Sequence, residues 1–299
     1  PLNCPICDQG GECELQDTAM GYGKGVSQFT EMKRVVEDED LGPLVATDMS
    51  LCIHCTRCVR FGQEIAGVDD LGLMGRGDNA YISTYLNKGL RSELSGNMID
   101  LCPVGALTSK PFQYKGRSWG FRQHFGVSPH DCVGSNLYYH TIAKGYDHLS
   151  DVMRILPAYN EALNEGWLSD RDRFGYEGIG SDKRLKMPMR KVKGKWQEIG
   201  WEEVLTYLAR HLASMDKAHR EKMGVWLSTQ MTLEEAYLCQ KLFRKLGVGH
   251  IDHRLLENCM QQDNMLRPYP KVSTAVIAKS KQIILVGSNI RYEQPIIPM

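Results

Sequence analysis

Cysteine spacing constrains this chain more than any other feature of its sequence. Seven of the ten cysteines form two sets: Cys4, Cys7 and Cys13 in the pattern C-x2-C-x5-C, and Cys52, Cys55 and Cys58 in the pattern C-x2-C-x2-C with Cys102-Pro103 far downstream. A cubic iron–sulfur cluster needs several thiolates on a tight loop and one more from a remote segment. The second set has this arrangement, so the sequence indicates an electron carrier.

A structural zinc site is the main alternative for either set, because C-x2-C pairs also bind zinc. The second set favours an iron–sulfur cluster, since its triplet crowds three sulfurs together and a Cys-Pro pair completes it, as in bacterial ferredoxins. The first set has three cysteines, one ligand short of a closed site, and its spacing alone leaves zinc open.

Composition narrows the class of protein without naming a partner. The 299 residues suffice for two or three domains, and 24% of them are charged. No charge-free apolar run approaches ~18 residues, so we expect no membrane insertion. The formal net charge is zero, which removes a general electrostatic case for binding nucleic acid or an anionic membrane. Ligand-like cysteine spacing in a large chain favours a reducing compartment over a disulfide scaffold.

The two ends of the chain suggest a fragment. Pro1 follows no Met and no signal region, and Met299 comes shortly after a strand-like run. We therefore expect further residues on both sides.

The first 112 residues read as short elements around the cysteines. Residues 1 to about 40 are rich in glycine and predict loops that wrap a cluster. Residues 59–67 predict a short helix that ends at Gly67, residues 75–79 a turn, and residues 80–85 a strand. Cys102 follows a second polar turn, so two half-domains meet at the second cysteine set.

The remaining residues change from strands to an alternation of strands and helices. Residues 136–142 and 151–157 predict short strands. Residues 201–215 and a helix capped by Thr232-Leu233-Glu234-Glu235 have helical patterns, and residues 225–228 and 281–287 predict buried strands. Strand, helix and strand in this order indicate a parallel sheet.

Several long motifs resemble one family. These motifs are PLNCPICDQGGECELQD, RCVRFGQEIAGVDDLG, SELSGNMIDLCPVGALTSKPF, VMRILPAYNEALNEGWLSDRDRFGYEG and GKWQEIGWEEVL. They are similar to the large iron–sulfur subunit of the proton-pumping NADH:quinone oxidoreductase, respiratory complex I. The similarity is close over residues 1 to about 205 and looser beyond.

The resemblance implies ligand sets that spacing alone does not give. Cys4, Cys7 and Cys13 match the cysteines of a [4Fe–4S] cluster whose fourth ligand is a His, and that His would stand just before Pro1. Cys52, Cys55, Cys58 and Cys102 match the ligands of an all-cysteine [4Fe–4S] cluster. A [2Fe–2S] domain precedes both in the full-length family members.

The resemblance also implies an order of domains, α+β and then α/β. Residues 1–40 end a His(Cys)3-type domain, 41–113 form a ferredoxin-like [4Fe–4S] domain, 114–180 form a small β-rich domain, and 181–299 begin a molybdopterin-oxidoreductase-like domain without molybdenum. Some relatives hold a further cluster in the third of these domains. Here Cys132 is followed by Val133-Gly134-Ser135-Asn136, and Trp167-Leu168-Ser169-Asp170 stands where the distant cysteine belongs, so we expect that cluster to be absent. Cys132, Cys239 and Cys259 are interpreted as ordinary cysteines.

Three residues beside the second set raise narrower questions. His54 could bond a sulfur or face solvent. Arg57 and Arg60 could favour the reduced cluster by their positive charge, or simply face water. No catalytic triad or paired carboxylates are identifiable, and Gly287-Ser288-Asn289 lacks the dinucleotide-binding fingerprint.

The resemblance therefore predicts an electron-transfer subunit that relays electrons from NADH through [4Fe–4S] clusters toward quinone, with no catalytic residues of its own. Its partners would be the NADH/FMN-binding and quinone-side iron–sulfur subunits of the hydrophilic arm. It would lie peripherally on the cytoplasmic face of a bacterial inner membrane, or on the matrix side in a mitochondrion. The iron–sulfur part of an NAD-linked formate dehydrogenase or hydrogenase is the first alternative, and a zinc-stabilised interaction scaffold is the second.

Overall fold

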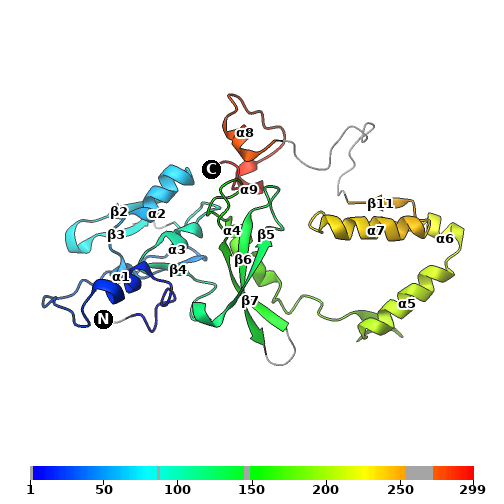
Figure 1. Ribbon diagram of the computed structural model, residues 1–299, viewed down its shortest axis with the longest axis horizontal. Helices are drawn as coiled ribbons and strands as arrows, with labels where there is room; N and C mark the ends of the chain where they lie inside the picture. Colours follow the sequence, from blue (N-terminus) through cyan, green and yellow to red (C-terminus); the bar gives the residue numbers. More distant parts are fainter. Residues whose placement is uncertain (1–2, 86–87, 145–148, 254–271) are drawn as a thin grey trace. The chain divides into compact units, whose positions relative to one another are not determined.

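The computed structural model describes residues 3–85, 88–144, 149–253 and 272–299. The chain divides into two compact units, residues 1–180 with 272–299 and residues 181–271. Figure 1 shows the first unit in blue to green with the orange-red end of the chain. None of the described helices is long and apolar enough to cross a membrane.

Short elements surround the seven spaced cysteines in the first unit. They are α1 (Glu14–Tyr22), β1 (Val45–Thr47), α2 (Arg57–Arg60) with a following π-helical turn (Phe61–Ile65), β2 (Leu71–Met74), β3 (Tyr81–Thr84), α3 (Asn97–Leu101) and β4 (Leu107–Ser109). β1 pairs antiparallel with β4, and β2 pairs antiparallel with β3. The pairing of β1 with β4 brings the segment after Cys102 beside the segment before Cys52. The expected helix at 59–67 and strand at 80–85 are confirmed.

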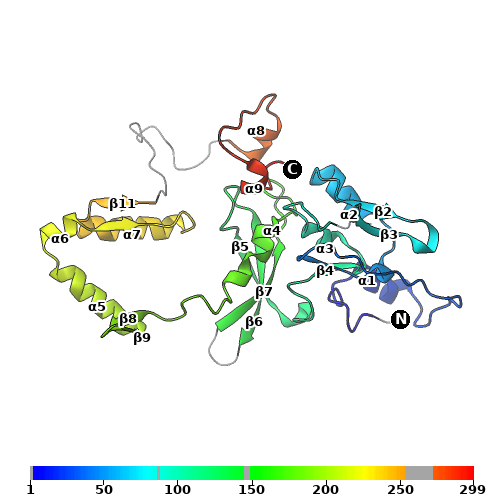
Figure 2. The ribbon, with the colours of Figure 1, turned by 180° about the vertical axis from the view of Figure 1, so that it is seen from behind.

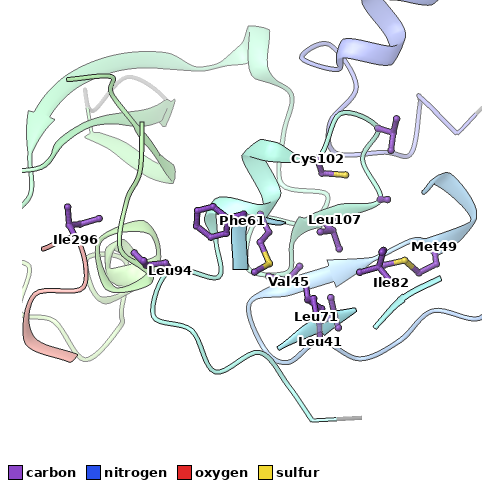
Figure 3. Packing of buried hydrophobic residues seen from close by; sticks show 13 residues of the cluster. Leu41, Val45, Met49, Phe61, Leu71, Ile82, Leu94, Cys102, Leu107 and Ile296 are labelled. Atoms are coloured by element: carbon purple, nitrogen blue, oxygen red, sulfur yellow. The ribbon is translucent and has the colours of Figure 1, made fainter. Parts of the chain in front are cut away.

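A hydrophobic core holds the elements from β1 to β4 together (Figure 3). Its buried members are Leu41, Val45, Met49, Phe61, Leu71, Ile82, Leu94, Met98, Cys102, Val104, Ala106, Leu107 and Ile296. Cys102 is 8% exposed and packs within this core, close to Leu107 in Figure 3. Because the remote cysteine is a core residue, anything bound to its sulfur is coupled to the packing of the unit.

A three-stranded antiparallel sheet follows in the same unit. Its strands, in spatial order, are β5 (Arg122–Val127), β6 (Asn136–Lys144) and β7 (Leu149–Pro157). A short helix, α4 (Asp170–Phe174), contacts β7, and Figure 2 shows it in front of the sheet. Leu137, Ile155, Leu168 and Tyr176 form the buried core beneath. The strands expected at 136–142 and 151–157 are confirmed. Most side chains of β5 are exposed. An exposed strand has no need of apolar residues, and the sequence of β5 therefore did not predict a strand.

Buried hydrogen bonds join the sheet region to the helix that leads to Cys102. The Asn97 side chain is 1% exposed; its Nδ2 donates to the Leu168 carbonyl at 2.8 Å, and its Oδ1 accepts from the Leu168 N–H at 2.9 Å. The Asp170 carboxylate accepts from the N–H groups of Ser95 at 3.0 Å and Gly96 at 2.7 Å, so it satisfies free donors where α3 begins. These contacts fix α3 from a segment that lies more than 70 residues later in the chain.

The second unit contains short strands and longer helices. They are β8 (Met189–Val192), β9 (Lys195–Glu198), α5 (Trp201–Ser214), α6 (Lys217–Glu221), β10 (Gly224–Trp226), α7 (Leu233–Lys245) and β11 (His250–Asp252). β8 and β9 form an antiparallel hairpin, and β10 pairs parallel with β11 across α7. Thr232 and Glu235 make the expected reciprocal capping box of α7. The predicted helices are confirmed. A parallel pair does form across a helix, but its second strand is β11 and not the predicted strand at 281–287.

Two predictions are wrong. Residues 281–287 form no strand, and Ile284 and Val286 are 85% and 86% exposed. An apolar run becomes a strand only where another strand pairs with it, and β10 instead pairs with β11 in the other unit. The chain then ends with α8 (Thr274–Ala278) and α9 (Ile290–Glu293).

The other error concerns the glycine-rich first segment, for which the sequence predicted loops. Residues Glu14–Tyr22 of this segment form helix α1. Glu14 and Asp17 lie in its first turn, where negative charge stabilises the free N–H groups. The Leu15 N–H also donates to the Pro103 carbonyl at 3.3 Å, so a remote segment supports the helix start.

Replacing Asn97 should test the link between α3 and the sheet region. Asn97→Ala leaves the buried N–H and carbonyl of Leu168 without partners, and we expect a loss of about 1–3 kcal/mol for such a group. Thermal and urea unfolding of the protein measure it. Asn79→Ala, in an exposed turn, is the matched control and should stay within about 0.5 kcal/mol of the parent. Equal effects of the two changes would contradict the assigned role of Asn97.

Candidate metal centres

The second cysteine set lines one pocket. Cys52 follows a single helical turn (Met49–Leu51), Cys58 lies in α2, and Cys102 ends α3. The pocket wall consists of Cys52, Cys55, Cys58 and Cys102 with Met49, Ile53, Thr56, Arg57, Ile82, Pro103, Val104, Ala106 and Leu107. Four sulfurs thus meet in a mostly apolar setting, which suits a metal cluster that must be kept from water.

The backbone between Cys52 and Cys58 adopts a conformation that non-glycine residues rarely use. His54 and Thr56 have φ of +55° and +58°. This turn directs the His54 N–H toward the Cys52 sulfur at 3.4 Å. Such strain at two residues of one loop is typical of a ligand-binding segment.

The thiols of this set influence one another's charge. Burial, followed by the charges of Cys102, Cys52 and Cys55, raises the pKa of Cys58 to about 12. Burial is also the main cause of the raised pKa of Cys52, to which Cys102 and Cys55 contribute. Thiolates in this pocket therefore need a cationic centre, and metal binding must release protons.

The first cysteine set is gathered at the start of α1. Burial raises the pKa of Cys7, and the charges of Cys13, Asp8 and Cys4 act in the same direction. The Gln9 N–H bonds the Cys7 sulfur and opposes this rise. Arg117 holds the loop by donating to the carbonyls of Pro5 and Cys7. The three sulfurs are thus close neighbours on one loop.

The segment Cys102–Gly105 touches both sets. The Gln9 side chain donates to the Cys102 carbonyl at 2.6 Å, and the Cys13 thiol donates to the Pro103 carbonyl at 3.4 Å. Gly105 has φ of +68°, and a Cβ at this position would overlap the Cys7 sulfur. Only glycine allows this close approach. The two candidate centres are therefore separated by one short stretch of backbone.

Zinc and a cubic cluster place different demands on four sulfurs. A zinc ion needs them at about 2.3 Å from one point, whereas a cubic cluster holds them further apart, at its corners. Among the described residues, no three His, Cys, Asp or Glu side chains are grouped around the position of a single ion.

Three residues beside the second cysteine set were candidates for acting on a cluster, and all three have other partners. The His54 ring is half-buried, and its Nε2 lies 2.8 Å from the Ala80 carbonyl, so it neither bonds a sulfur nor faces open solvent. Arg57 pairs with Glu14 at 3.1 Å, and Arg60 pairs with Glu64 at 3.0 Å. Both arginine charges are compensated at the surface.

Sequence reasoning missed Arg34, Gln9 and Gly105. Arg34 donates to the carbonyls of Cys52 at 3.0 Å, Met49 at 3.0 Å and Ala80 at 2.8 Å. No motif marks an arginine 18 residues before its target. Gly105 alone carried a signal, since it lies three residues after Cys102 in the Cys-Pro segment.

Two of the remaining three cysteines, Cys132 and Cys239, lie among the described residues. Cys132 is exposed, and its N–H donates to Gln294 at 2.9 Å; Cys239 is half-buried in α7. Cys259 falls outside the described residues. Near Cys132, Ser128 and Ser169 donate to the buried Asp172 carboxylate at 2.6 and 2.9 Å. This part of the chain forms a hydrogen-bonded network of serine and aspartate.

Four family models match successive parts of the chain. They describe the iron-sulfur binding region of NADH-ubiquinone oxidoreductase-G at 1–27, the ferredoxin-like domain of NADH-quinone oxidoreductase subunit 3 at 42–108, an NDSU1/NuoG-like 4Fe-4S domain at 126–177, and molybdopterin oxidoreductase at 184–298. This order confirms the expected fold class, ferredoxin-like iron–sulfur domains followed by a molybdopterin-oxidoreductase domain.

Curated relatives agree with these matches. The chain is 42% identical to the NADH-ubiquinone oxidoreductase 75 kDa subunit of Reclinomonas americana, over 99% of this chain and 44% of the relative. It is 40% identical to the G subunit of the NADH-quinone oxidoreductase of Rickettsia felis, over 99% of this chain and 43% of the relative. It is also 43% identical to the mitochondrial NADH dehydrogenase [ubiquinone] iron-sulfur protein 1 of Solanum tuberosum, over 98% and 38%.

A solved structure of an NAD+-reducing [NiFe]-hydrogenase shares 27% identity, with a TM-score of 0.34 over 38% of this chain and 50% of that chain. A TM-score this low carries no functional weight. The chain spans less than half the length of the curated relatives it matches. On identities near 40% along almost its whole length, it belongs to the family of the large, 75 kDa-type iron–sulfur subunit of NADH:quinone oxidoreductases.

Proposed function

We propose that this chain carries two [4Fe–4S] clusters that relay electrons from NADH toward quinone. The observation that supports this most directly is the pocket in which Cys52, Cys55, Cys58 and Cys102 meet, with a second cysteine loop directly across the Cys102–Gly105 segment. A [4Fe–4S] cluster supplies a one-electron carrier, and the protein sets its potential and its distance from the next carrier.

The ligands would come from two loops and one remote segment. Cys52, Cys55, Cys58 and Cys102 would hold one cluster entirely by sulfur. Cys4, Cys7 and Cys13 would hold the other, with a His immediately before Pro1 as its fourth ligand. Apolar side chains around the second set, such as Met49 and Ile82, would exclude water from the cluster.

We further propose four domains with boundaries near residues 40, 113 and 180, and no third cluster in residues 114–180. Although the matched family model at 126–177 describes a 4Fe-4S domain, Cys132 is the only cysteine in that stretch. A single thiolate cannot hold a cubic cluster. The full-length protein would carry an additional [2Fe–2S] centre in residues preceding this chain.

The partners follow from the proposed relay. The chain lacks an NADH site and a quinone site in this proposal, so an NADH/FMN-binding subunit and a quinone-side iron–sulfur subunit of the hydrophilic arm would stand before and after it. We propose a peripheral place on the cytoplasmic or matrix side of the membrane. Within the enzyme it would act as an oxidoreductase subunit without catalytic residues.

Cys102→Ala should remove the second cluster. The fourth sulfur and a core contact disappear together, and we expect iron to fall by about four atoms per chain with loss of one EPR signal after dithionite. Cys132→Ala, at an exposed thiol, is the matched control and should leave both signals intact. Full iron content in the Cys102 variant, or a lost signal in the Cys132 variant, would show the ligand assignment to be wrong. A colourless, zinc-containing parent protein would favour the scaffold alternative.

Gly105→Ala should disturb the first cluster although Gly105 is not one of its ligands. The added methyl group would overlap the Cys7 sulfur, so the loop of the first set must shift. Gly67→Ala is the matched control, because Gly67 has φ of +63° but nothing within 4 Å of the new Cβ. It should show only the backbone strain of about 1–2 kcal/mol. Iron and sulfide analysis of both variants decides; equal iron contents would refute the close approach.

Metal analysis of the full-length native protein should find neither molybdenum nor tungsten. A shared fold does not by itself supply a cofactor site. Stoichiometric molybdenum or tungsten would instead support the formate dehydrogenase alternative.

A further inference from the structure

Arg34 makes three contacts that converge on the loop of the second cysteine set. Its Nη1 donates to the carbonyl of Cys52, and its Nη2 donates to the carbonyls of Met49 and Ala80, at 2.8 to 3.0 Å. The side chain is half-buried, and its Nε is buried without a hydrogen-bond partner in the described part of the chain. The guanidinium group is thus held in place by backbone carbonyls.

The charge of Arg34 differs from that of its neighbours. In the residues that the structure describes, Arg34 forms no ion pair with a carboxylate, whereas Arg57 and Arg60 each pair with a glutamate. The Arg57 and Arg60 side chains are also 46% and 67% exposed. Paired, solvated charges act weakly on their surroundings, and an unpaired, partly buried charge acts more strongly.

The charge of Arg34 lies beside the pocket, because its guanidinium donates to the carbonyl of the pocket residue Cys52 at 3.0 Å. Electrostatic attraction by this fixed cation favours any added negative charge at the pocket. Reduction of a [4Fe–4S] cluster adds one electron and therefore one unit of negative charge.

We propose that Arg34 is a positioning residue that raises the reduction potential of the centre held by Cys52, Cys55, Cys58 and Cys102. This inference rests on the proposed electron-relay function. One electron enters from a one-electron donor, no bond forms or breaks, and the fixed guanidinium charge stabilises the product. Arg60, which follows Cys58, contributes little because its charge is exposed and neutralised by Glu64.

The test uses the full-length protein in its complex and an EPR-monitored redox titration with dithionite as reductant. Arg34→Met should lower the equilibrium constant for one-electron reduction of this centre by about tenfold, a shift of about 59 mV to lower potential. Arg34→Lys keeps the charge and should restore most of the potential. Arg60→Met, at an exposed charge paired with Glu64, is the matched control and should leave the potential unchanged.

Salt provides a second readout. The difference between the parent and Arg34→Met should persist at high ionic strength, because a half-buried charge is poorly screened. The potential of the first centre should not move in any of these variants. A purely structural role of Arg34 would change iron content and leave the potential of the remaining intact centres as it is.

Three outcomes would overturn the inference. They are an unchanged potential in Arg34→Met with its signal intact, an equal shift in Arg60→Met, and loss of the cluster in both Arg34→Met and Arg34→Lys, which would show that Arg34 only holds the loop. If Arg34→Met alone loses the cluster, the potential measured in Arg34→Lys decides. A potential equal to that of the parent supports the role of the charge. A potential about 59 mV lower, the shift expected for loss of the charge, refutes it. Absence of any [4Fe–4S] signal from the parent protein is a different result, and it would refute the proposed function itself.

Discussion

The rest of this molecule depends on the placement of Cys102 and the three residues after it. Cys102 belongs to the hydrophobic core, while the carbonyls of Cys102 and Pro103 accept hydrogen bonds from the first cysteine loop. Gly105 then passes so close to Cys7 that no side chain fits between them. One stretch of backbone therefore packs the core, supplies the remote sulfur of one set and supports the other set. Because these roles are inseparable, the distance between the two candidate centres is fixed by the fold.

This arrangement leaves several sulfurs in an unfavourable state when no metal is bound. The Cys58 thiol is partly buried near three other cysteines, and its raised pKa favours the protonated form. A bound cluster would remove this difficulty, since iron would replace the protons and neutralise the thiolates. Its binding energy would also stabilise the strained turn at His54 and Thr56, which by itself favours unfolding of the loop by roughly 1–3 kcal/mol per residue. The free energy of metal binding and the folding of residues around the pocket are thus coupled.

The sequence predicted well what depends on neighbours along the chain. The capping box at Thr232 predicted the start of α7, and short strand-like runs predicted β6 and β7. It failed where a remote segment decides the outcome. Helix α1 begins where Pro103 accepts a backbone hydrogen bond, and the apolar run at 281–287 remains exposed because no strand pairs with it among the described residues. Neither condition is visible in a local window.

The arginines near the second cysteine set show most clearly that local sequence does not determine which charges lie close to the pocket. Arg57 and Arg60 flank Cys58 in the sequence, so proximity along the chain made them the natural candidates for tuning a cluster. The fold gives each of them a glutamate and a place in solvent. Arg34, distant in sequence, reaches the loop through three carbonyls and forms no ion pair with a described carboxylate. What a charge contributes to a redox centre depends on its burial and its counter-ions, and both are properties of the folded chain. Carbonyls hold Arg34 without cancelling its charge, and this is the physical reason that we propose a role for it and not for Arg60, whose charge Glu64 neutralises at the surface.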